Sequence, residues 1–327
     1  MDVKLPEGLE AFLAAAGWGD AVIEPLAGDA SFRRYFRIRM DEQSAMLMDA
    51  PPPTEDPAPF LRAAKWLDAY GLRAPRILAE DAPRGLVLLE DFGEVRVREY
   101  LDQWPADEAE VYRAAIDALV ELRRLPPGPF LDYSLAEYQR EAKLFVDWYC
   151  SARGLDVDAA SYSAAWEEVL SPMLPRQRPG VVVLRDYHAE NIMLLGSLGD
   201  QGLLDFQDAL VGHPAYDLVS LLQDARRDVA PELEAQMLDY YLSKTGAGAD
   251  FTADYARLGA QRNAKIVGIF VRLWKRDGKP RYLDYIPRVW ALLERDLAHP
   301  ALAPVARWFD ANVPAGLREA GGGSWQP

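Results

Sequence analysis

The alternation of hydrophobic and polar residues predicts strands in the first part of the chain. From Phe32 to Arg39 the pattern has a period of two, which puts Phe36 and Ile38 on one face and Arg37 on the other. Short apolar runs predict further strands at 45–50, 75–80 and 85–94. We expect these strands to form one antiparallel sheet.

Helical spacing dominates after residue 91. Helices are predicted at 106–124, 135–153, 159–170, 214–227, 258–276, 282–298 and 302–312, in addition to earlier ones at 5–16 and 58–70. The change of pattern predicts an α+β fold with an N-terminal lobe at 1–91 and a helical C-terminal lobe at 92–315. The glycine-rich end, 316–327, predicts a flexible tail.

One stretch, 181–208, follows neither pattern for long. It contains three short apolar runs, and polar residues follow each of them: Asp186, Asn191 and Asp205. Oxygen ligands suit Mg²⁺, and a carboxylate beside an acceptor hydroxyl suits a general base. The spacing Asp-x-x-x-x-Asn, then Asp-Phe, is that of the catalytic and metal-binding loops in kinase-type phosphoryl transfer.

These three residues are the principal site candidates. We predict Asp186 as the catalytic base and Asn191 and Asp205 as ligands of Mg²⁺. Any one of them alone would more commonly cap a strand or a helix. Their spacing, each after an apolar run, favours catalysis.

Composition and charge narrow the class of protein. The 327 residues are 50% hydrophobic, enough for a sizeable core, and the net charge of −15 argues against nucleic acid or an anionic membrane as partner. The single cysteine, Cys150, excludes an internal disulfide and a cysteine-based metal site. Without a basic leader or an apolar run of about 18 residues, we expect a cytoplasmic protein, and we expect a monomer.

The motif resembles that of the aminoglycoside phosphotransferase/choline kinase superfamily. Two further stretches, 205–229 and 262–283, make the chain similar to bacterial anomeric sugar kinases that act on N-acetylmuramate and N-acetylglucosamine. The resemblance implies a protein-kinase-like two-lobed fold with ATP and Mg²⁺ as cofactors and a small sugar as acceptor. It also implies transfer of the γ-phosphate to the C1 hydroxyl, in the recycling of peptidoglycan sugars.

The resemblance also implies a nucleotide site in the N-terminal lobe. Its expected residues are a small-residue loop over the phosphates and two hinge residues near adenine: Gly28, Asp29, Ala30, Ser31, Glu90 and Phe92. Where the usual phosphate-binding lysine is missing, we expect the arginine-rich strand (Arg33, Arg34, Arg37) to supply the charge, with Arg33 or Arg34 on the phosphates; weak or absent activity is the alternative. An ordinary hairpin turn and a solvated sheet face are the alternatives. The chain departs from the general kinase pattern in having no lysine or arginine near Met48 and no glutamate in the helix at 58–70 to pair with it.

Candidate acceptor contacts flank the catalytic motif or lie on a later basic helix. They are Arg185, Glu190, Gln207, Asp208, Arg262 and Lys265. On the basic helix the last two could meet the lactyl carboxylate of N-acetylmuramate, although a solvated helix face is the ordinary explanation. We expect His188 and Asp217 to brace the catalytic loop.

Two alternatives remain open at this point. The acceptor could be another small alcohol, such as an aminoglycoside or choline. The missing lysine also allows a non-catalytic nucleotide-binding protein of the same fold, although the retained Asp186, Asn191 and Asp205 argue for an enzyme.

Overall fold

The computed structural model describes residues 4–26 and 32–325. The chain forms two compact units. Unit 1 contains Met1–Asp107 and Glu190–Ala209, and unit 2 contains Glu108–Ala189 and Leu210–Pro327. The catalytic motif therefore contributes residues to both units. No helix within the described ranges is long and apolar enough to cross a membrane.

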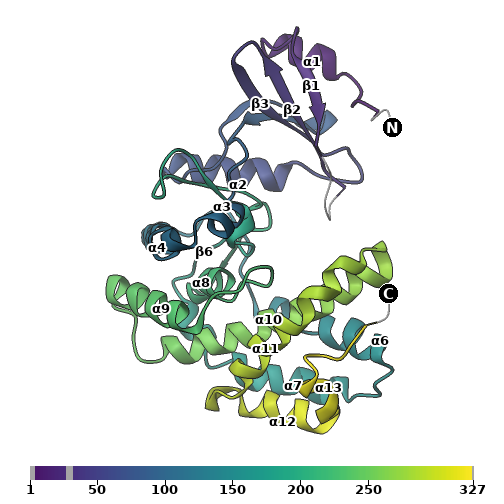
Figure 1. Ribbon diagram of the computed structural model, residues 1–327, viewed down its shortest axis with the longest axis vertical. Helices are drawn as coiled ribbons and strands as arrows, with labels where there is room; N and C mark the ends of the chain where they lie inside the picture. The colour runs from purple at the N-terminus through teal and green to yellow at the C-terminus, as the bar shows by residue number, and fades with distance from the viewer. Residues whose placement is uncertain (1–3, 27–31, 326–327) are drawn as a thin grey trace. The chain divides into compact units, whose positions relative to one another are not determined.

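Unit 1 is built on an antiparallel sheet (Figure 1). The five strands are β1 (Val22–Pro25), β2 (Arg34–Met40), β3 (Gln43–Asp49), β4 (Ile77–Asp81) and β5 (Leu86–Glu90), in the order β1-β2-β3-β5-β4. The predicted antiparallel sheet is confirmed. Phe36 and Ile38 of β2 are buried in a cluster with Leu9 and Phe12 of α1 (Leu9–Ala15), so the alternation in the sequence places this core.

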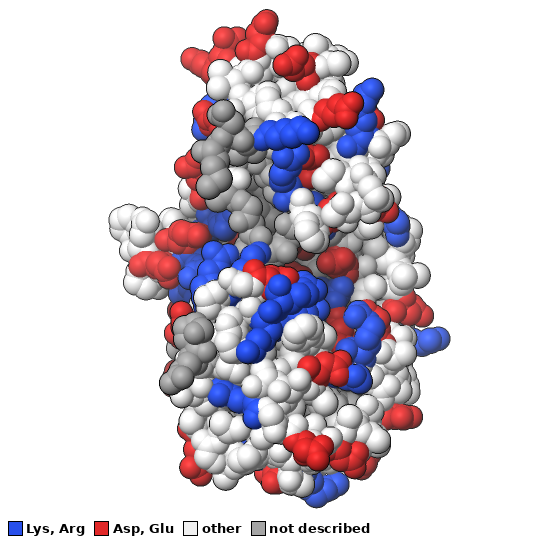
Figure 2. All heavy atoms as spheres, turned by 90° about the vertical axis from the view of Figure 1, so that its right-hand side faces the viewer, with Lys and Arg blue, Asp and Glu red and all other residues white. Residues whose placement is uncertain are grey.

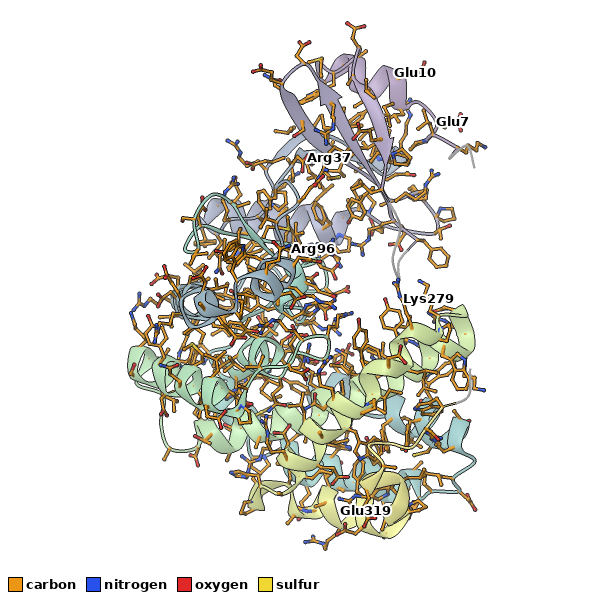
Figure 3. All side chains as sticks on the ribbon, in the orientation of Figure 1. Glu7, Glu10, Arg37, Arg96, Lys279 and Glu319 are labelled. Carbon is orange, nitrogen blue, oxygen red and sulfur yellow. The ribbon has the colours of Figure 1, made fainter. Side chains whose placement is uncertain are left out.

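The polar face of β2 is less exposed than a solvated sheet face would be. Arg37, labelled in Figure 3, is only 7% exposed. Its guanidinium lies 2.8 Å from Asp91, donates to Gly93 O at 3.0 Å and pairs with Glu94. This arginine therefore fixes the turn that follows β5.

Unit 1 contains further helices and strands besides α1 and the five-stranded sheet. They are α2 (Ala58–Ala69), η1 (Ala82–Arg84), α3 (Val97–Gln103), η2 (Pro105–Asp107), β7 (Ile192–Leu194) and β8 (Gln201–Leu203). Leu203 N–H donates to Arg73 O at 2.7 Å, and Leu194 N–H donates to Val95 O at 2.9 Å. A Cβ at Gly202 would lie 2.5 Å from the Phe92 ring, so only glycine permits this approach. These contacts join the β7–β8 hairpin to unit 1.

Unit 2 is mainly helical. Its helices are α4 (Glu108–Arg124), α5 (Leu135–Ala142), the π-helix η3 (Phe145–Cys150), α6 (Ser151–Arg153), α7 (Ala159–Leu170), α8 (Ala215–Leu222), α9 (Pro231–Thr245), α10 (Phe251–Asp277), α11 (Ile286–Leu297), α12 (Ala303–Asn312) and α13 (Ala315–Glu319). Short 3₁₀ turns are η4 (Leu174–Gln177), η6 (Pro280–Tyr285) and η7 (Pro300–Leu302), and η5 (Ala189–Asn191) leads into unit 1. The strands β6 (Val181–Val183) and β9 (Leu210–Gly212) form a two-stranded ladder.

The long helix α10 organises unit 2 (Figure 1). It packs against α5, α8, η3 and α11. At Gly268 an added Cβ would lie 2.3 Å from the Leu144 backbone, so a glycine is needed for this close approach. Basic residues near the end of α10 are partly or fully exposed, and Figure 2 shows Lys and Arg spheres gathered on this unit despite the negative net charge.

Several helices differ from their predicted bounds. The helix expected at 135–153 is divided by η3, and the helix expected at 214–227 ends at Leu222. The next residue, Gln223, leaves helical geometry, and its amide donates to buried Asp296 at 3.0 Å. Helix α9 was not predicted, although Pro231 at its start and a left-handed Gly246 at its end are ordinary boundary signals.

Residues at the glycine-rich end of the chain contact the rest of unit 2 within the described ranges, and the flexible tail at 316–327 stays a prediction. Tyr149 OH donates to Gly322 O at 3.0 Å, and Arg153 donates to Ser324 O at 2.8 Å. The same guanidinium lies 3.5 Å from the centre of the Trp325 ring. Composition alone does not show that Trp325 contacts a cationic side chain. The last two residues, 326 and 327, lie outside the described ranges.

Glu90→Gln should reveal a pH-dependent contribution to the stability of unit 1. Hydrogen bonds from Arg73, followed by those from Arg76, lower the pKa of Glu90 from 4.5 to about 2 against the effect of burial. The ionised form therefore stabilises the fold above about pH 4.5, and this contribution is lost as the pH falls toward about 2. Urea unfolding curves should show a variant less stable than the wild type at neutral pH, with a difference that shrinks on acidification.

Glu24→Gln is the matched control for that measurement. Glu24 pairs with Arg39 on the same sheet, but both side chains are about half exposed. Its removal should change the free energy of unfolding by less than about 1 kcal/mol. A Glu90→Gln difference that stays constant with pH would contradict the role assigned to the carboxylate.

Candidate active site

The catalytic motif begins with a strained residue at the end of β6. Arg185 has a φ of 74°, in the left-handed region that costs a non-glycine residue about 1–2 kcal/mol. Asp217 of α8 compensates by accepting hydrogen bonds from the backbone N–H groups of Leu184 (2.6 Å) and Arg185 (2.8 Å). The hydroxyl of Ser220 donates to Arg185 O at 3.2 Å. Helix α8 thus holds the peptide groups immediately before Asp186.

Asp217 is itself buried, with 3% of its surface exposed. Burial raises the pKa of Asp217 to about 7, against the two backbone donors, which favour the ionised form. The negative charge of Asp186 also raises the pKa of Asp217, and the positive charge of Arg262 lowers it. The electrostatic environment of Asp217 is therefore coupled to that of Asp186.

The second half of the loop is held by the segment that follows α8. Ala189 N–H donates to Asp224 at 3.3 Å, and the backbone N–H of Arg226 donates to the same carboxylate at 2.8 Å. The Arg226 guanidinium lies 2.9 Å from Nε2 of the buried His188. Because a guanidinium only donates, Nε2 of His188 accepts and its proton lies on Nδ1. His188 contributes to positioning this loop.

A buried carboxylate lies beside the strained residue. Glu141 of α5 is 1% exposed and binds the Arg185 guanidinium, the Tyr133 hydroxyl and, at 3.0 Å, Lys265 Nζ. Burial raises the pKa of Glu141, but Lys265 and Arg185 outweigh burial and hold it below its usual value. Glu141 is therefore ionised and balances part of the positive charge around it.

The basic candidates of unit 2 surround this carboxylate and α8. Arg262 is 3% exposed and donates to Ser220 Oγ at 2.8 Å. The side chains of Arg185 and Lys265 are 16% and 11% exposed. These three residues are therefore not solvated surface charges, which was the alternative for the basic helix.

The metal candidates lie in unit 1, on the turn before β7 and the segment after β8. Asn191 Nδ2 lies 3.4 Å from Asp205 Oδ2, and Leu204 N–H donates to Asn191 O at 2.9 Å. Gln207 donates to the other carboxylate oxygen of Asp205 at 2.7 Å. Asp205 has a φ of 58°, a second left-handed residue in the motif. An amide and a carboxylate side by side are hard oxygen donors, so this pair fits Mg²⁺.

Two other predicted acceptor contacts lie in the same part of unit 1. Glu190 pairs with Arg98 of α3, so its carboxylate takes part in the packing of the unit. Asp208 is exposed. Of these two residues, Asp208 is the more exposed.

The predicted nucleotide residues differ in what they contact. Gly28, Asp29, Ala30 and Ser31 lie outside the described residues. Arg34 binds Asp49 at 2.8 Å, and Arg33 lies 3.4 Å from Glu55.

The hinge candidates contact neighbouring residues of unit 1. Glu90 N–H donates to Arg76 O at 2.9 Å, and its carboxylate binds Arg73 at 2.7 Å. The guanidinium of Arg73 lies 4.8 Å from the centre of the Phe92 ring. The side chain and N–H of Glu90 are therefore both engaged within the unit.

Sequence reasoning missed two residues that support the loop. In the sequence Glu141 looks like any acid on an amphipathic helix, such as Glu137 of the same helix, which is partly exposed and pairs with Arg140. Ser220 lies in an apolar helix with no motif around it. Only the packing of α5, α8 and α10 brings these side chains to the loop, so no local signal identified them.

Comparison with solved structures supports the fold class. A choline/ethanolamine kinase family protein from Mesorhizobium loti matches with a TM-score of 0.62 at 18% sequence identity, over 92% of this chain and 99% of that chain. The predicted protein-kinase-like α+β fold, with a small antiparallel sheet and a larger helical part, is confirmed.

The model of the phosphotransferase enzyme family (APH) matches residues 22–260. The chain belongs to this family, and the predicted class of enzyme, a phosphotransferase with an alcohol group as acceptor, is confirmed.

Two relatives are similar over nearly their whole length. An N-acetylmuramate/N-acetylglucosamine kinase from Caulobacter vibrioides is 40% identical, over 94% of this chain and 96% of its own. An enzyme of the same name from Pseudomonas aeruginosa is 39% identical, over 97% of this chain and 95% of its own. The predicted resemblance to such kinases is confirmed.

Asp217→Ala should strongly destabilise unit 2. It would leave the N–H groups of Leu184 and Arg185 buried without their acceptor, at about 1–3 kcal/mol each. We expect a loss of roughly 2–6 kcal/mol in the free energy of unfolding, measured by urea denaturation. Asp217→Asn retains one acceptor oxygen and should lose less.

Glu121→Ala on α4 is the control, because Glu121 makes only an exposed pair with Arg124. Its effect should stay within about 0.5 kcal/mol. An Asp217→Ala variant as stable as this control would show that α8 does not hold the loop.

Proposed function

We propose that the protein is an ATP-dependent sugar kinase that transfers the γ-phosphate to the C1 hydroxyl of N-acetylmuramate and N-acetylglucosamine. The observation that carries this proposal is the sequence identity of 40% and 39% to two kinases of that name, over nearly the whole chain. The Asp186, Asn191 and Asp205 motif supplies the residue types that such a transfer needs. Use of ATP and release of a sugar phosphate into metabolism fit a cytoplasmic enzyme.

The nucleotide belongs to unit 1 in this proposal. Asn191 and Asp205 would hold Mg²⁺, which neutralises charge on the β- and γ-phosphates when it is bound. Small residues of the loop at 28–31 would cover the phosphates through their backbone N–H groups. Because the N–H and side chain of Glu90 are engaged, backbone groups after β5, around Phe92, would contact adenine.

Asp186 is the proposed general base. Its carboxylate accepts the proton of the C1 hydroxyl as that oxygen forms a bond to the γ-phosphorus and the bond from phosphorus to the bridging oxygen breaks, which releases ADP. An anomeric hydroxyl is more acidic than an ordinary sugar alcohol, so a carboxylate is a sufficient base. Asp217 and Ser220 contribute by fixing the peptide groups before Asp186, because an in-line transfer depends on position.

The acceptor belongs to unit 2 in this proposal. Arg185, Lys265 and Glu141 together carry one net positive charge, and Lys265 and Arg185 are the partly exposed members. This charge would attract the lactyl carboxylate of N-acetylmuramate. Arg262 would act through Ser220, since its side chain is buried. Exposed Asp208 is the candidate for a sugar hydroxyl.

A panel of acceptors tests the proposed reaction. The purified protein is incubated with MgATP and N-acetylmuramate, N-acetylglucosamine, glucose or kanamycin, and ADP release and ³¹P spectra are followed. We expect a C1 phosphate on both N-acetyl sugars and none on kanamycin. Phosphate on kanamycin alone, or ATP binding without transfer to any acceptor, would refute the proposed substrate class.

Asp186→Asn tests the base. The amide keeps the shape of the side chain but cannot take a proton, so kcat should fall by roughly 10²–10⁴. ADP affinity by calorimetry and the midpoint of urea unfolding should remain those of the wild type. Glu121→Gln serves as a control with one acid removed from an exposed site. Near-normal turnover in Asp186→Asn would exclude the carboxylate as base.

A further inference from the structure

The third strand of the sheet lacks a cation where kinases of this fold carry a phosphate-binding lysine. In β3 the residues Met46, Leu47 and Met48 are followed by Asp49. Phosphoryl transfer requires positive charge on the β- and γ-phosphates in addition to the metal. Another cation therefore supplies this charge if the enzyme uses ATP, and the cations of unit 1 are the candidates because that unit holds the proposed metal ligands.

Most cations on or beside the sheet are paired with acids other than the proposed metal ligands. Arg34 makes its bonds to buried Asp49 and to Lys4 O. Arg37, labelled beside the sheet in Figure 3, pairs with Asp91 and Glu94 in the turn after β5. Arg39 and Lys65 form exposed pairs with acids of β1 and β4.

Arg33 differs from these residues in its surroundings. Its Nε lies 3.4 Å from Glu55 Oε2, and Glu55 Oε1 accepts the backbone N–H of Phe32 at 3.3 Å. The side chains of Arg33 and Glu55 are 14% and 18% exposed, so the pair is more shielded from solvent than an ordinary surface pair. Glu55, in the connector before α2, thus holds both the backbone and the guanidinium at the start of β2.

The register of the sheet places Arg33 beside the position of the missing cation, because Tyr35 of β2 pairs with Met48 of β3 and Arg33 lies two residues before Tyr35 in the alternation. The electrostatic surroundings of Arg33 agree with this placement. Burial lowers the pKa of Arg33, but Tyr35, Glu55 and Asp205 outweigh it and raise the pKa above its ordinary value. Asp205 also influences Tyr35, the next residue on the same face of β2. All four residues belong to unit 1, so this proximity lies within one compact unit.

We propose that Arg33, oriented by Glu55, binds the β- and γ-phosphates in place of the lysine and glutamate pair of other kinases. This inference rests on the proposed function, since it requires ATP as the donor. A guanidinium suits the role because it bonds two phosphate oxygens at once and stays ionised. Compared with other kinases, the phosphate-binding cation would lie at the start of β2 instead of on β3. The acid that orients it would lie in the connector before α2 instead of on α2.

The affinity of a series of nucleotides tests this assignment without requiring any acceptor. Calorimetry measures Mg²⁺-dependent binding of ATP, ADP and AMP to the wild type and to Arg33→Met. We expect Arg33→Met to weaken ATP and ADP roughly ten- to hundredfold, the range for loss of hydrogen bonds to a charged group, and to leave AMP unchanged. Arg33→Lys should recover part of the loss.

Glu55→Gln tests the orienting role. It keeps an acceptor oxygen but removes the charge, so ATP affinity should fall less than in Arg33→Met, again without a change for AMP. Arg39→Met is the control, because it removes a cation from the same face of the same strand, where Arg39 pairs with exposed Glu24. It should bind all three nucleotides as the wild type does, and urea unfolding should show all variants folded.

Two results would overturn the inference. One is an Arg33→Met variant with wild-type ATP affinity, and the other is an equal loss for AMP and ATP, which would indicate a general disturbance of the unit. Either result leaves the proposed reaction intact if the wild type still phosphorylates the N-acetyl sugars. A wild type that binds none of the nucleotides would instead refute the proposed function together with the inference.

Discussion

One buried carboxylate fixes the backbone on which the proposed chemistry depends. Asp217 binds two successive N–H groups, and Ser220, one turn later on α8, donates to the carbonyl of the strained Arg185. A residue in the left-handed region persists only where its surroundings impose that conformation. Here helix α8 imposes the left-handed conformation of Arg185, and this conformation sets the direction in which the backbone reaches Asp186.

The same region concentrates charge in a small buried volume. Glu141 neutralises part of the charge of Arg185 and Lys265, and Arg262 reaches the loop through a hydroxyl. A buried acid without these cations would be costly to ionise, and the cations without the acid would repel one another. Glu141 and its partners therefore depend on each other, and they couple α5 and α10 to the loop.

Local signals in the sequence were sufficient for the sheet, for most helices and for the motif that marks the family. The alternation in β2 placed Phe36 and Ile38 in the core because a period of two leaves no other arrangement. The sequence could not show that Glu141 is buried, because the helices packed against α5 decide which of its acids is buried. The contact between Tyr149 and Gly322 was not visible in the sequence either, since it joins residues far apart along the chain.

The contacts of Trp325 give the segment after α13 a part in the packing of unit 2. Trp325 lies against Arg153 and near the rings of Tyr149 and Trp274, which come from two different helical segments. Shortening the chain before α13 would uncover these aromatic surfaces and promote self-association.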